Sequence, residues 1–213
     1  MKLLSSWSGG KDSCFALMKA VEAGGEVMVL LNMMNENGKI SRSHGIPLAV
    51  LKQQAQAINV PLETCQATWA NYEQEFIATL QNLTKTYKLQ AAVFGDIDIQ
   101  SHRDWEEKVC AAAELKAQLP LWQGERKQLV IDMINAGVKA IIVSCNTDLG
   151  LEFLGREINI ELLEELERIG VDCCGENGEY HTLVVDCPLF KEPVKLPEYA
   201  KVKHENYCFL DWN

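Results

Sequence analysis

A run of small and polar residues near the start of the chain has the chemistry of a phosphate site. Its members are Ser8, Gly9, Gly10, Lys11, Asp12 and Ser13. Paired glycines let a backbone approach its ligand closely, hydroxyl groups donate hydrogen bonds, and a lysine adds positive charge. Asp12 alone would repel a phosphate, so we expect it to bind Mg²⁺ or to cap the following helix. The run therefore predicts an anion site with Asp12 as the candidate metal ligand.

This run lies between a predicted strand, Leu3–Trp7, and a predicted helix, Cys14–Val21, whose apolar residues have helical spacing. The start of a helix offers free amides and a partial positive charge, which suit a phosphate. The patterns G-x-x-x-x-G-K-[ST] and G-x-G-x-x-G are both absent. The alternative is an ordinary glycine-rich turn with a capping side chain, but the full hexapeptide at this junction favours the phosphate site.

A second polar segment, CGENGEYHT, covers Cys174–Thr182. Its candidate substrate and catalytic residues are Glu176, Asn177, Glu179, Tyr180, His181 and Thr182. A solvated hairpin turn is the alternative, because Glu-Asn-Gly is common in turns. A turn does not need two carboxylates together with tyrosine, histidine and threonine, so we expect the segment to bind a polar substrate, hold Mg²⁺ or position a nucleophile.

A third group follows a predicted strand at residues 91–96. Gly95 and Asp96 lie at the carboxyl end of this strand, where ligands of parallel sheets bind. Arg103 is placed to meet a phosphate or carboxylate, although an ion pair with Glu107 four residues later is the alternative. His44, in another loop, is included with the candidate nucleotide ligands, although an isolated loop histidine, like the one at position 102, often has no role.

The elements that must position these groups alternate between strand and helix. Continuous apolar strands separated by helices predict a mostly parallel, doubly wound α/β sheet with helices on both faces. We expect strands at 26–33, 61–65, 91–96 and 138–144, a short extended piece at 119–122, and helices at 47–58, 72–87, 101–117 and 125–136. After residue 146 an acidic helix at 160–169 is followed by strands and turns. We therefore predict a phosphate-binding domain at 1–145 and a small C-terminal α+β domain at 146–213.

Composition limits the class of protein. The 213 residues carry a formal net charge of −10, with 47% hydrophobic and 23% charged residues. The acidic balance argues against a general grip on nucleic acid or anionic lipid, and no apolar run reaches the roughly 20 residues of a membrane span. None of the eight cysteines forms a C-x-x-C pair, so we expect buried, reduced thiols in a cytoplasmic protein. A homodimer is compatible with the sequence.

Five motifs together resemble the diphthine–ammonia ligase family. They are SGGKDS at Ser8–Ser13, GDI at Gly95–Ile97 followed by Q-x-x-R-x-W, PLW at Pro120–Trp122, LGREI at Leu154–Ile158, and CGENGEYHT. SGGKDS alone resembles the pyrophosphate loop (PP-loop) of the wider ATP pyrophosphatase superfamily, whereas CGENGEYHT is far more specific. The resemblance implies a Rossmann-like, nucleotide alpha-hydrolase-like domain followed by a small C-terminal domain.

The resemblance also implies an activity. ATP would adenylate the carboxylate of diphthine on elongation factor 2, and ammonia would displace AMP to leave an amide. Carried over to this chain, the PP-loop run would hold ATP with Mg²⁺ in the domain at 1–145, and Asp96 would lie beside the nucleotide or metal. The residues that would line the acyl and ammonia side are Glu176, Asn177, Glu179, Tyr180 and His181, which makes 146–213 the substrate-side domain. The catalytic set would be Lys11, Asp12, Glu176, Glu179 and His181. Two alternatives stay open from the sequence, a PP-loop enzyme that modifies tRNA and a non-catalytic ATP sensor.

Overall fold

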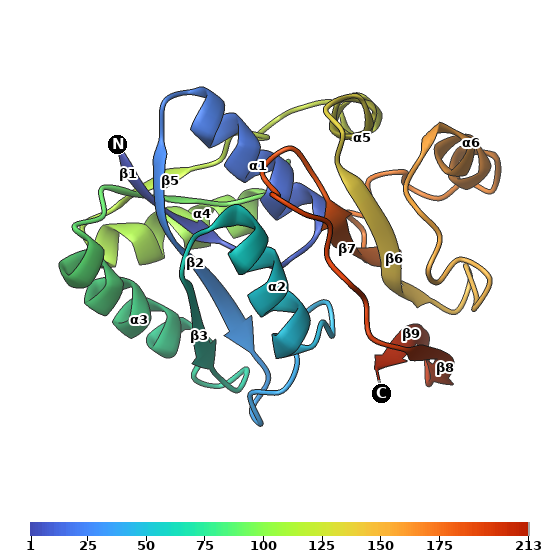
Figure 1. Ribbon diagram of the computed structural model, residues 1–213, viewed down its shortest axis with the longest axis horizontal. Helices are drawn as coiled ribbons and strands as arrows, with labels where there is room; N and C mark the ends of the chain where they lie inside the picture. The colour runs from blue at the N-terminus through green and yellow to red at the C-terminus, as the bar shows by residue number, and fades with distance from the viewer. Residues whose placement is uncertain (213) are drawn as a thin grey trace.

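The computed structural model describes residues 1–212 and places two sheets beside each other, with helices packed on both (Figure 1). The elements in chain order are β1 (Lys2–Ser6), α1 (Lys11–Glu22), β2 (Glu26–Met34), α2 (Leu48–Ile58), β3 (Leu62–Gln66), α3 (Tyr72–Tyr87), β4 (Ala91–Val93), α4 (Gln100–Ala112), β5 (Lys116–Gln118), α5 (Arg126–Asn135), β6 (Lys139–Asn146), α6 (Ile160–Arg168), β7 (Tyr180–Asp186), β8 (Tyr199–His204) and β9 (Tyr207–Trp212).

The first sheet is fully parallel and has the order β3-β2-β1-β4-β5. The chain adds strands on one side of β1 and then returns to add β4 and β5 on the other side. The loops after β1 and β4 therefore diverge and leave a crevice at the carboxyl ends of these two strands, where open α/β sheets bind ligands. This is the edge at which the sequence predicts the phosphate site.

Side chains of β1 alternate between two cores. Leu3 packs in the cluster that contains Phe15 of α1, whereas Leu4 packs with Phe76 of α3 and Val109 of α4. Because successive residues of a strand point to opposite faces, both faces of the sheet are buried under helices. The prediction of a doubly wound α/β sheet is confirmed.

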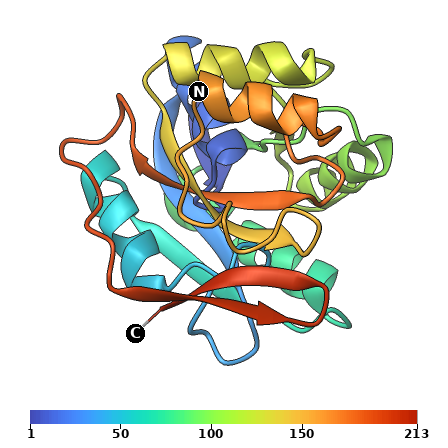
Figure 2. The ribbon, with the colours of Figure 1, turned by 90° about the vertical axis from the view of Figure 1, so that its right-hand side faces the viewer.

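The second sheet is antiparallel, with the order β7-β6-β9-β8. Helices α5 and α6 lie next to each other over it (Figure 2), and Lys127 Nζ of α5 is 2.7 Å from Glu167 Oε1 of α6. The sequence correctly predicts a small α+β part, but its assignment of residues 138–144 to the parallel sheet is wrong. A buried apolar run predicts a strand without saying which strands pair with it.

The predicted domain boundary after residue 145 falls inside β6. Since β6 pairs only with β7 and β9 among the named strands, the two sheets divide the chain earlier, between β5 and β6. We propose that division in place of the one suggested by the sequence.

The segment after α4 corrects a second expectation. The helix predicted at 101–117 ends at Ala112, Glu114 takes a left-handed φ of 58°, and residues 116–118 form β5. The extended piece expected at 119–122 therefore lies three residues earlier. Ala91 pairs with Lys116 along the edge of the sheet, and this pairing overrides a local sequence that favours helix.

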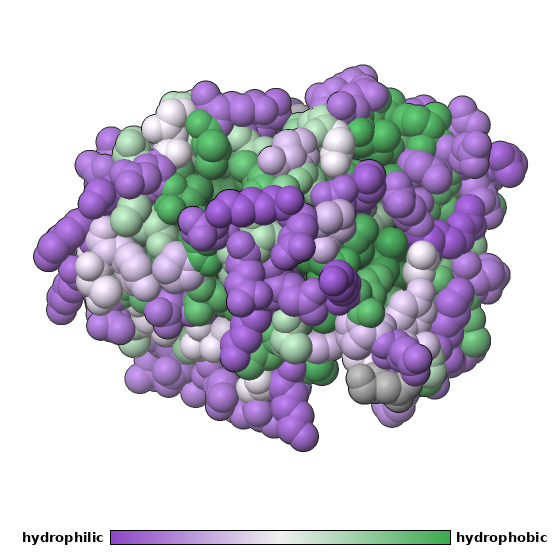
Figure 3. All heavy atoms as spheres, in the orientation of Figure 1, coloured by the Kyte–Doolittle hydropathy of each residue, from purple (hydrophilic) through white to green (hydrophobic). Residues whose placement is uncertain are grey.

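No helix within residues 1–212 is long and apolar enough to cross a membrane. On the face drawn in Figure 3, hydrophobic patches are separated by hydrophilic side chains. All eight cysteines are free, and all except the half-buried Cys65 are buried, which confirms the expectation that most of them are buried.

Candidate functional site

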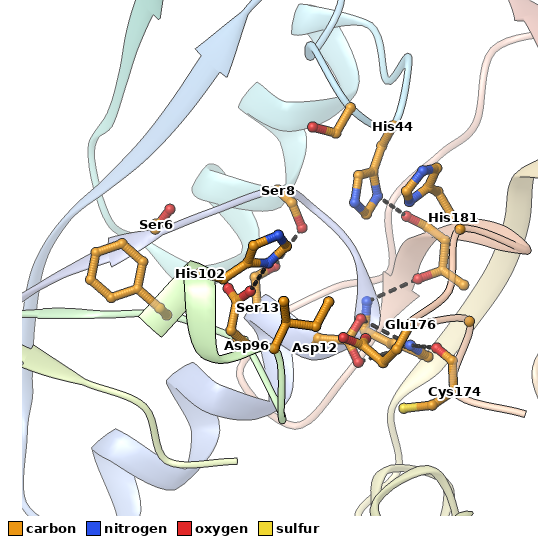
Figure 4. Close-up of a pocket in the computed structure, with 18 of the residues that line it drawn as sticks. Ser6, Ser8, Asp12, Ser13, His44, Asp96, His102, Cys174, Glu176 and His181 are labelled. Carbon is orange, nitrogen blue, oxygen red and sulfur yellow. Dashed lines mark hydrogen bonds and ion pairs between the residues drawn. The ribbon is translucent and has the colours of Figure 1, made fainter. Parts of the chain in front are cut away.

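A cavity of about 400 Å³ lies at the carboxyl ends of β1 and β4 and is closed on its far side by the segment that leads into β7 (Figure 4). It brings together groups from both sheets. The predicted site residues that line it are Ser8, Lys11, Asp12, Ser13, His44, Gly95, Asp96, Glu176, Tyr180, His181 and Thr182. Residues that are far apart in the sequence therefore form a single site in the folded protein.

The loop between β1 and α1 is held in place through its backbone. Gly9 has a φ of 86°, a conformation that favours glycine. Its carbonyl accepts hydrogen bonds from Val184 N at 2.9 Å and from Gln54 Nε2 at 3.0 Å. Gly10 then starts α1 with no side chain that could cap the helix. Thr182 binds the amide of Lys11, so the other amides of the first turn and the partial positive charge of the helix start are what an anion can bind.

Lys11 is almost fully buried, with 3% of its surface exposed. Its Nζ donates to Asp12 Oδ1 at 2.8 Å and to the carbonyl of Cys174 at 2.6 Å. Burial is the largest single influence and lowers the pKa of Lys11, but Asp12, Cys174 and Tyr180 together outweigh it and raise the pKa well above its usual value. Lys11 therefore stays charged and ties the loop to the far wall of the cavity.

Hydroxyl groups complete the loop. Ser8 Oγ and Ser13 Oγ are 3.0 Å apart, and Ser13 Oγ also donates to the carbonyl of Gly10 at 3.1 Å. From β7, Thr182 Oγ1 accepts the amide hydrogen of Lys11 at 3.0 Å. Thr182 was predicted as a substrate residue, and in this structure its hydroxyl supports the first turn of α1.

Two histidine rings lie close together in the cavity wall, tilted by 34° to each other. The rings of His44 and His181 have centroids 4.8 Å apart, and His44 Nδ1 lies 2.8 Å from the carbonyl of Thr182. Burial lowers the pKa of His44 to about 4, and burial together with His44 and Lys11 lowers that of His181 to about 3. Both rings are therefore neutral at pH 7 and can exchange hydrogen bonds without adding charge.

Asp12, Cys174 and Glu176 form a cluster whose donor atoms all lie within 4.8 Å of one another. Burial and the nearby Asp12 raise the pKa of Glu176 to about 7. Burial also raises the pKa of Cys174, which keeps this residue a thiol. Mg²⁺ prefers oxygen ligands, so the two carboxylates fit this ion and the thiol does not.

Beside β4, a carboxylate and an imidazole meet. Asp96 Oδ1 lies 2.7 Å from His102 Nδ1, and Figure 4 shows the two side chains across the cavity from Glu176. Behind them, Glu106 of α4 is buried with 3% exposure. Neither His102 nor Glu106 was singled out from the sequence, because an isolated histidine and a helical glutamate are ordinary surface residues.

Comparison with known proteins decides the family. Residues 1–117 match the diphthamide synthase N-terminal domain, and residues 125–213 match the diphthamide synthase C-terminal domain. The chain belongs to the diphthamide synthase family. The two matched regions meet between β5 and β6, where the sheets also divide.

Several curated relatives of this diphthamide synthase family member are named diphthine–ammonia ligase. The protein from Schizosaccharomyces pombe is 33% identical over 99% of this chain, which spans only 39% of that relative's length. The proteins from Danio rerio and Homo sapiens are each 28% identical over 98% of this chain, which spans 91% and 88% of their lengths. A solved structure described as a predicted subunit of tRNA methyltransferase from Methanocaldococcus jannaschii has 14% identity and a TM-score of 0.47, too weak a similarity to bear on function.

Five predicted residues of this diphthamide synthase family member do not line the cavity, namely Gly9, Gly10, Arg103, Asn177 and Glu179. Arg103 Nε donates to Glu107 Oε1 at 2.7 Å, so the surface ion pair considered for it is formed. Glu179 accepts hydrogen bonds from the backbone and side-chain nitrogens of Asn177, at 2.9 and 3.0 Å. Within CGENGEYHT these two residues shape the turn, while Tyr180 donates its hydroxyl to the carbonyl of Cys173.

Arg126 of α5 holds that turn against the first sheet. It donates to Asp98 at 2.7 and 2.8 Å and to Asp172 at 2.6 Å. Asp172 in turn accepts the amide hydrogens of Cys174 and Glu176, at 3.0 and 3.2 Å. This clamp positions Glu176, and only the tertiary structure reveals it, because its members are distant in sequence.

Proposed function

We propose that this chain is an AMP-forming ligase that activates a carboxylate with ATP and converts it into an amide with ammonia. The relatives named diphthine–ammonia ligase support this reaction class. The acid that we propose is diphthine on elongation factor 2 or a closely related acid. Such a protein substrate would place the reaction in the cytoplasm.

One observation carries the proposal, namely that the PP-loop and the CGENGEYHT segment face a single cavity. Lys11 and Thr182 are 171 residues apart in sequence and are joined by a hydrogen bond of 3.0 Å. An enzyme that transfers AMP to an acid must hold both partners in reach of each other. An ATP sensor would need the loop but not the polar segment that faces it.

On the nucleotide side, Ser8, Ser13 and the first-turn amides of α1 that follow Lys11 would bind the phosphates of ATP. ATP supplies the AMP group that turns a carboxylate into a reactive acyl donor, with pyrophosphate as the leaving group. Lys11 would act from behind the loop. Its ammonium is paired with Asp12, which reduces the repulsion between this carboxylate and the phosphates of ATP. Asp12 and Glu176 would hold Mg²⁺, as their carboxylate oxygens fit a hard cation.

On the acid side, the neutral rings of His44 and His181 are suited to contact the activated carboxyl group. A neutral imidazole donates or accepts one hydrogen bond and brings no charge that would compete for the phosphates. The turn that contains Asn177 and Glu179, together with Tyr180, supports this wall. Closing the cavity from this side would keep water from the activated acid.

The test measures whether AMP, pyrophosphate and the amide form only when ATP, the acid and ammonium are all present. With ATP, Mg²⁺, a diphthine-bearing substrate and ammonium, we expect AMP and pyrophosphate in amounts equal to the amide formed. Ser13→Ala should lower AMP formation about tenfold or more while the far-UV circular dichroism and melting temperature stay near wild type, because its hydroxyl faces the phosphate loop. Ser101→Ala on the exposed start of α4 is the matched control.

The same assay separates the alternatives. ADP in place of AMP would contradict the proposal, and so would AMP formation that needs tRNA. Tight ATP binding without turnover under any acid and ammonium condition would favour the sensor.

A further inference from the structure

The cluster of Glu106, Asp96 and His102 lies at the cavity wall. The function proposed above gives none of the three a role, although Asp96 was among the candidate ligands predicted from the sequence. Asp96 belongs to the loop after β4, whereas His102 and Glu106 are four residues apart and share one face of α4. All three side chains line the cavity. Burying a carboxyl group beside a carboxylate costs free energy unless hydrogen bonds or an opposite charge offset it. A ligand that donates hydrogen bonds or carries a positive charge would supply this offset.

Glu106 is the informative member. Its Oε2 is buried and has no hydrogen-bond partner within the described residues 1–212. Burial first, and then a hydrogen bond with Asp96, raises the pKa of Glu106 to about 10. Glu106 therefore keeps its proton at pH 7 and donates it in the hydrogen bond with Asp96. Glu106 Oε2 can therefore accept a hydrogen bond from a ligand in the cavity.

The surroundings suit a small cation. Tyr72 of α3 and Trp105 of α4 line the same part of the cavity, with ring centroids 5.8 Å apart. Aromatic faces attract cations and repel anions. The charged and titratable groups around the cluster are Glu107 and Cys110 on its own helix, Tyr72 on α3 with Arg42 beyond it, and Glu176 across the cavity with Asp12 and Lys11 beside it. Burial raises the pKa of Tyr72 and of Cys110 to about 12, so both are neutral at pH 7.

We propose that Glu106, Asp96 and His102 form the site that binds ammonium and delivers it as ammonia to the activated acid. Glu106 Oε2 and the Asp96 carboxylate accept hydrogen bonds from the ion, and His102 takes a proton from it. This inference rests on the proposed function, because it names the binding site of the nitrogen substrate. Mg²⁺ is a poorer fit, since it demands several oxygen ligands in octahedral geometry.

In the proposed reaction the nitrogen of ammonium loses two protons and takes the acyl group from AMP. His102 Nε2 removes one proton from NH₄⁺ while Asp96 holds Nδ1–H, and the half-exposed ring passes this proton to solvent. The lone pair of NH₃ forms the bond to the acyl carbon, the bond from this carbon to the AMP oxygen breaks, and AMP leaves with the electron pair. The nitrogen then loses its second proton to solvent, which leaves the amide.

The first experiment measures KM for ammonium chloride. Glu106→Met removes the acceptor and keeps the size of the side chain, so KM for ammonium should rise about ten- to hundred-fold, the loss expected for a hydrogen bond to a charged ligand. Glu106→Gln keeps a neutral acceptor oxygen and should restore most of this loss. Glu164→Met, at an exposed position of α6, is the control. KM for ATP and acid-dependent ATP–pyrophosphate exchange should change in none of them.

The second experiment tests the base. His102→Ala should lower kcat at pH 7 about tenfold or more with ammonium but not with hydroxylamine, which is largely uncharged at that pH and needs no deprotonation before attack. The defect should shrink as the pH rises and free ammonia accumulates. His204→Ala, on exposed β8, is the control. A purely structural role for His102 would lower the rate with both nucleophiles equally and at every pH.

These experiments distinguish failure of the proposed function from failure of the ammonium site. Absence of acid-dependent ATP–pyrophosphate exchange in the wild-type protein would overturn the proposed function itself. Normal exchange and amide formation, with an unchanged KM for ammonium in Glu106→Met, would overturn the ammonium site alone.

Discussion

The charge states of single buried residues are decided by their neighbours. Lys11 stays charged because Asp12 is in contact with it, whereas His44 and His181 stay neutral because burial and Lys11 disfavour a second cation. Glu106 keeps its proton for the corresponding reason, beside Asp96. The cavity thus holds several titratable groups whose pKa values have moved apart, a pattern typical of functional sites.

His44 makes the stability of the protein depend on pH. Its pKa is about 4 in the folded protein and 6.5 in the unfolded chain, so the unfolded chain binds the proton more readily. The contribution of the neutral ring is present in full above pH 6.5 and is lost as the pH falls from 6.5 toward 4. We expect the free energy of unfolding to drop by roughly 2 kcal/mol more between pH 7 and 5 in wild type than in His44→Asn.

Urea unfolding at the two pH values measures this difference, with His204→Asn as the control. Glu176 makes the protein more stable as the pH falls, because its pKa is raised in the folded protein. This contribution is present in wild type and in both variants, so it does not affect the comparison. An equal pH dependence in wild type and His44→Asn would contradict the buried neutral ring.

At the scale of elements, α2 holds the PP-loop through one side chain. Gln54 is fully buried, accepts the indole hydrogen of Trp7 at 2.9 Å and donates to the carbonyls of Gly9 and Val184, at 3.0 and 2.8 Å. These bonds join α2, the loop after β1, and β7. A polar residue on the buried face of a helix was overlooked in the sequence, because the apolar spacing of α2 predicted the helix without it.

Replacing this residue should destabilise the protein and loosen the loop. Gln54→Leu leaves Trp7 Nε1 and the Val184 carbonyl buried without their partner, so we expect unfolding to become easier by roughly 2–3 kcal/mol. The affinity for ATP should fall as well, since Gly9 loses one of its two restraints. Chemical denaturation and nucleotide binding measure both effects. Gln56→Leu, exposed on the same helix, should leave both close to wild type; equal effects in the two variants would show that Gln54 has no special role.

At the scale of the whole molecule, the site exists because the two sheets meet. One hydrophobic cluster contains residues from α1 and α2 as well as from β6 and β7, and the hydrogen bond from Val184 N to the Gly9 carbonyl crosses the junction at 2.9 Å. A ligand in the cavity contacts both sides, so its binding should stabilise the junction rather than one sheet alone.

Hydrogen exchange can show this coupling. With Mg²⁺ and a non-hydrolysable ATP analogue, we expect slower amide exchange in residues 8–13 and also in residues 174–182. The exposed hairpin of β8 and β9 supplies an internal reference that should not change. Protection limited to the first segment would mean that the C-terminal part does not take part in nucleotide binding.

The sequence by itself determined the local features of this protein. The SGGKDS run at a strand-to-helix junction, the alternation of strands and helices, and the polar CGENGEYHT segment are all encoded by neighbouring residues, so each was readable without a structure. The tertiary structure decided which distant groups meet. It placed β6 in the antiparallel sheet, moved a strand to 116–118, turned Arg103 toward Glu107, and set Glu106 behind Asp96 and His102. Periodicity reports which face of an element is buried, but partners, burial of single polar groups and the resulting pKa values depend on packing between segments far apart in the chain.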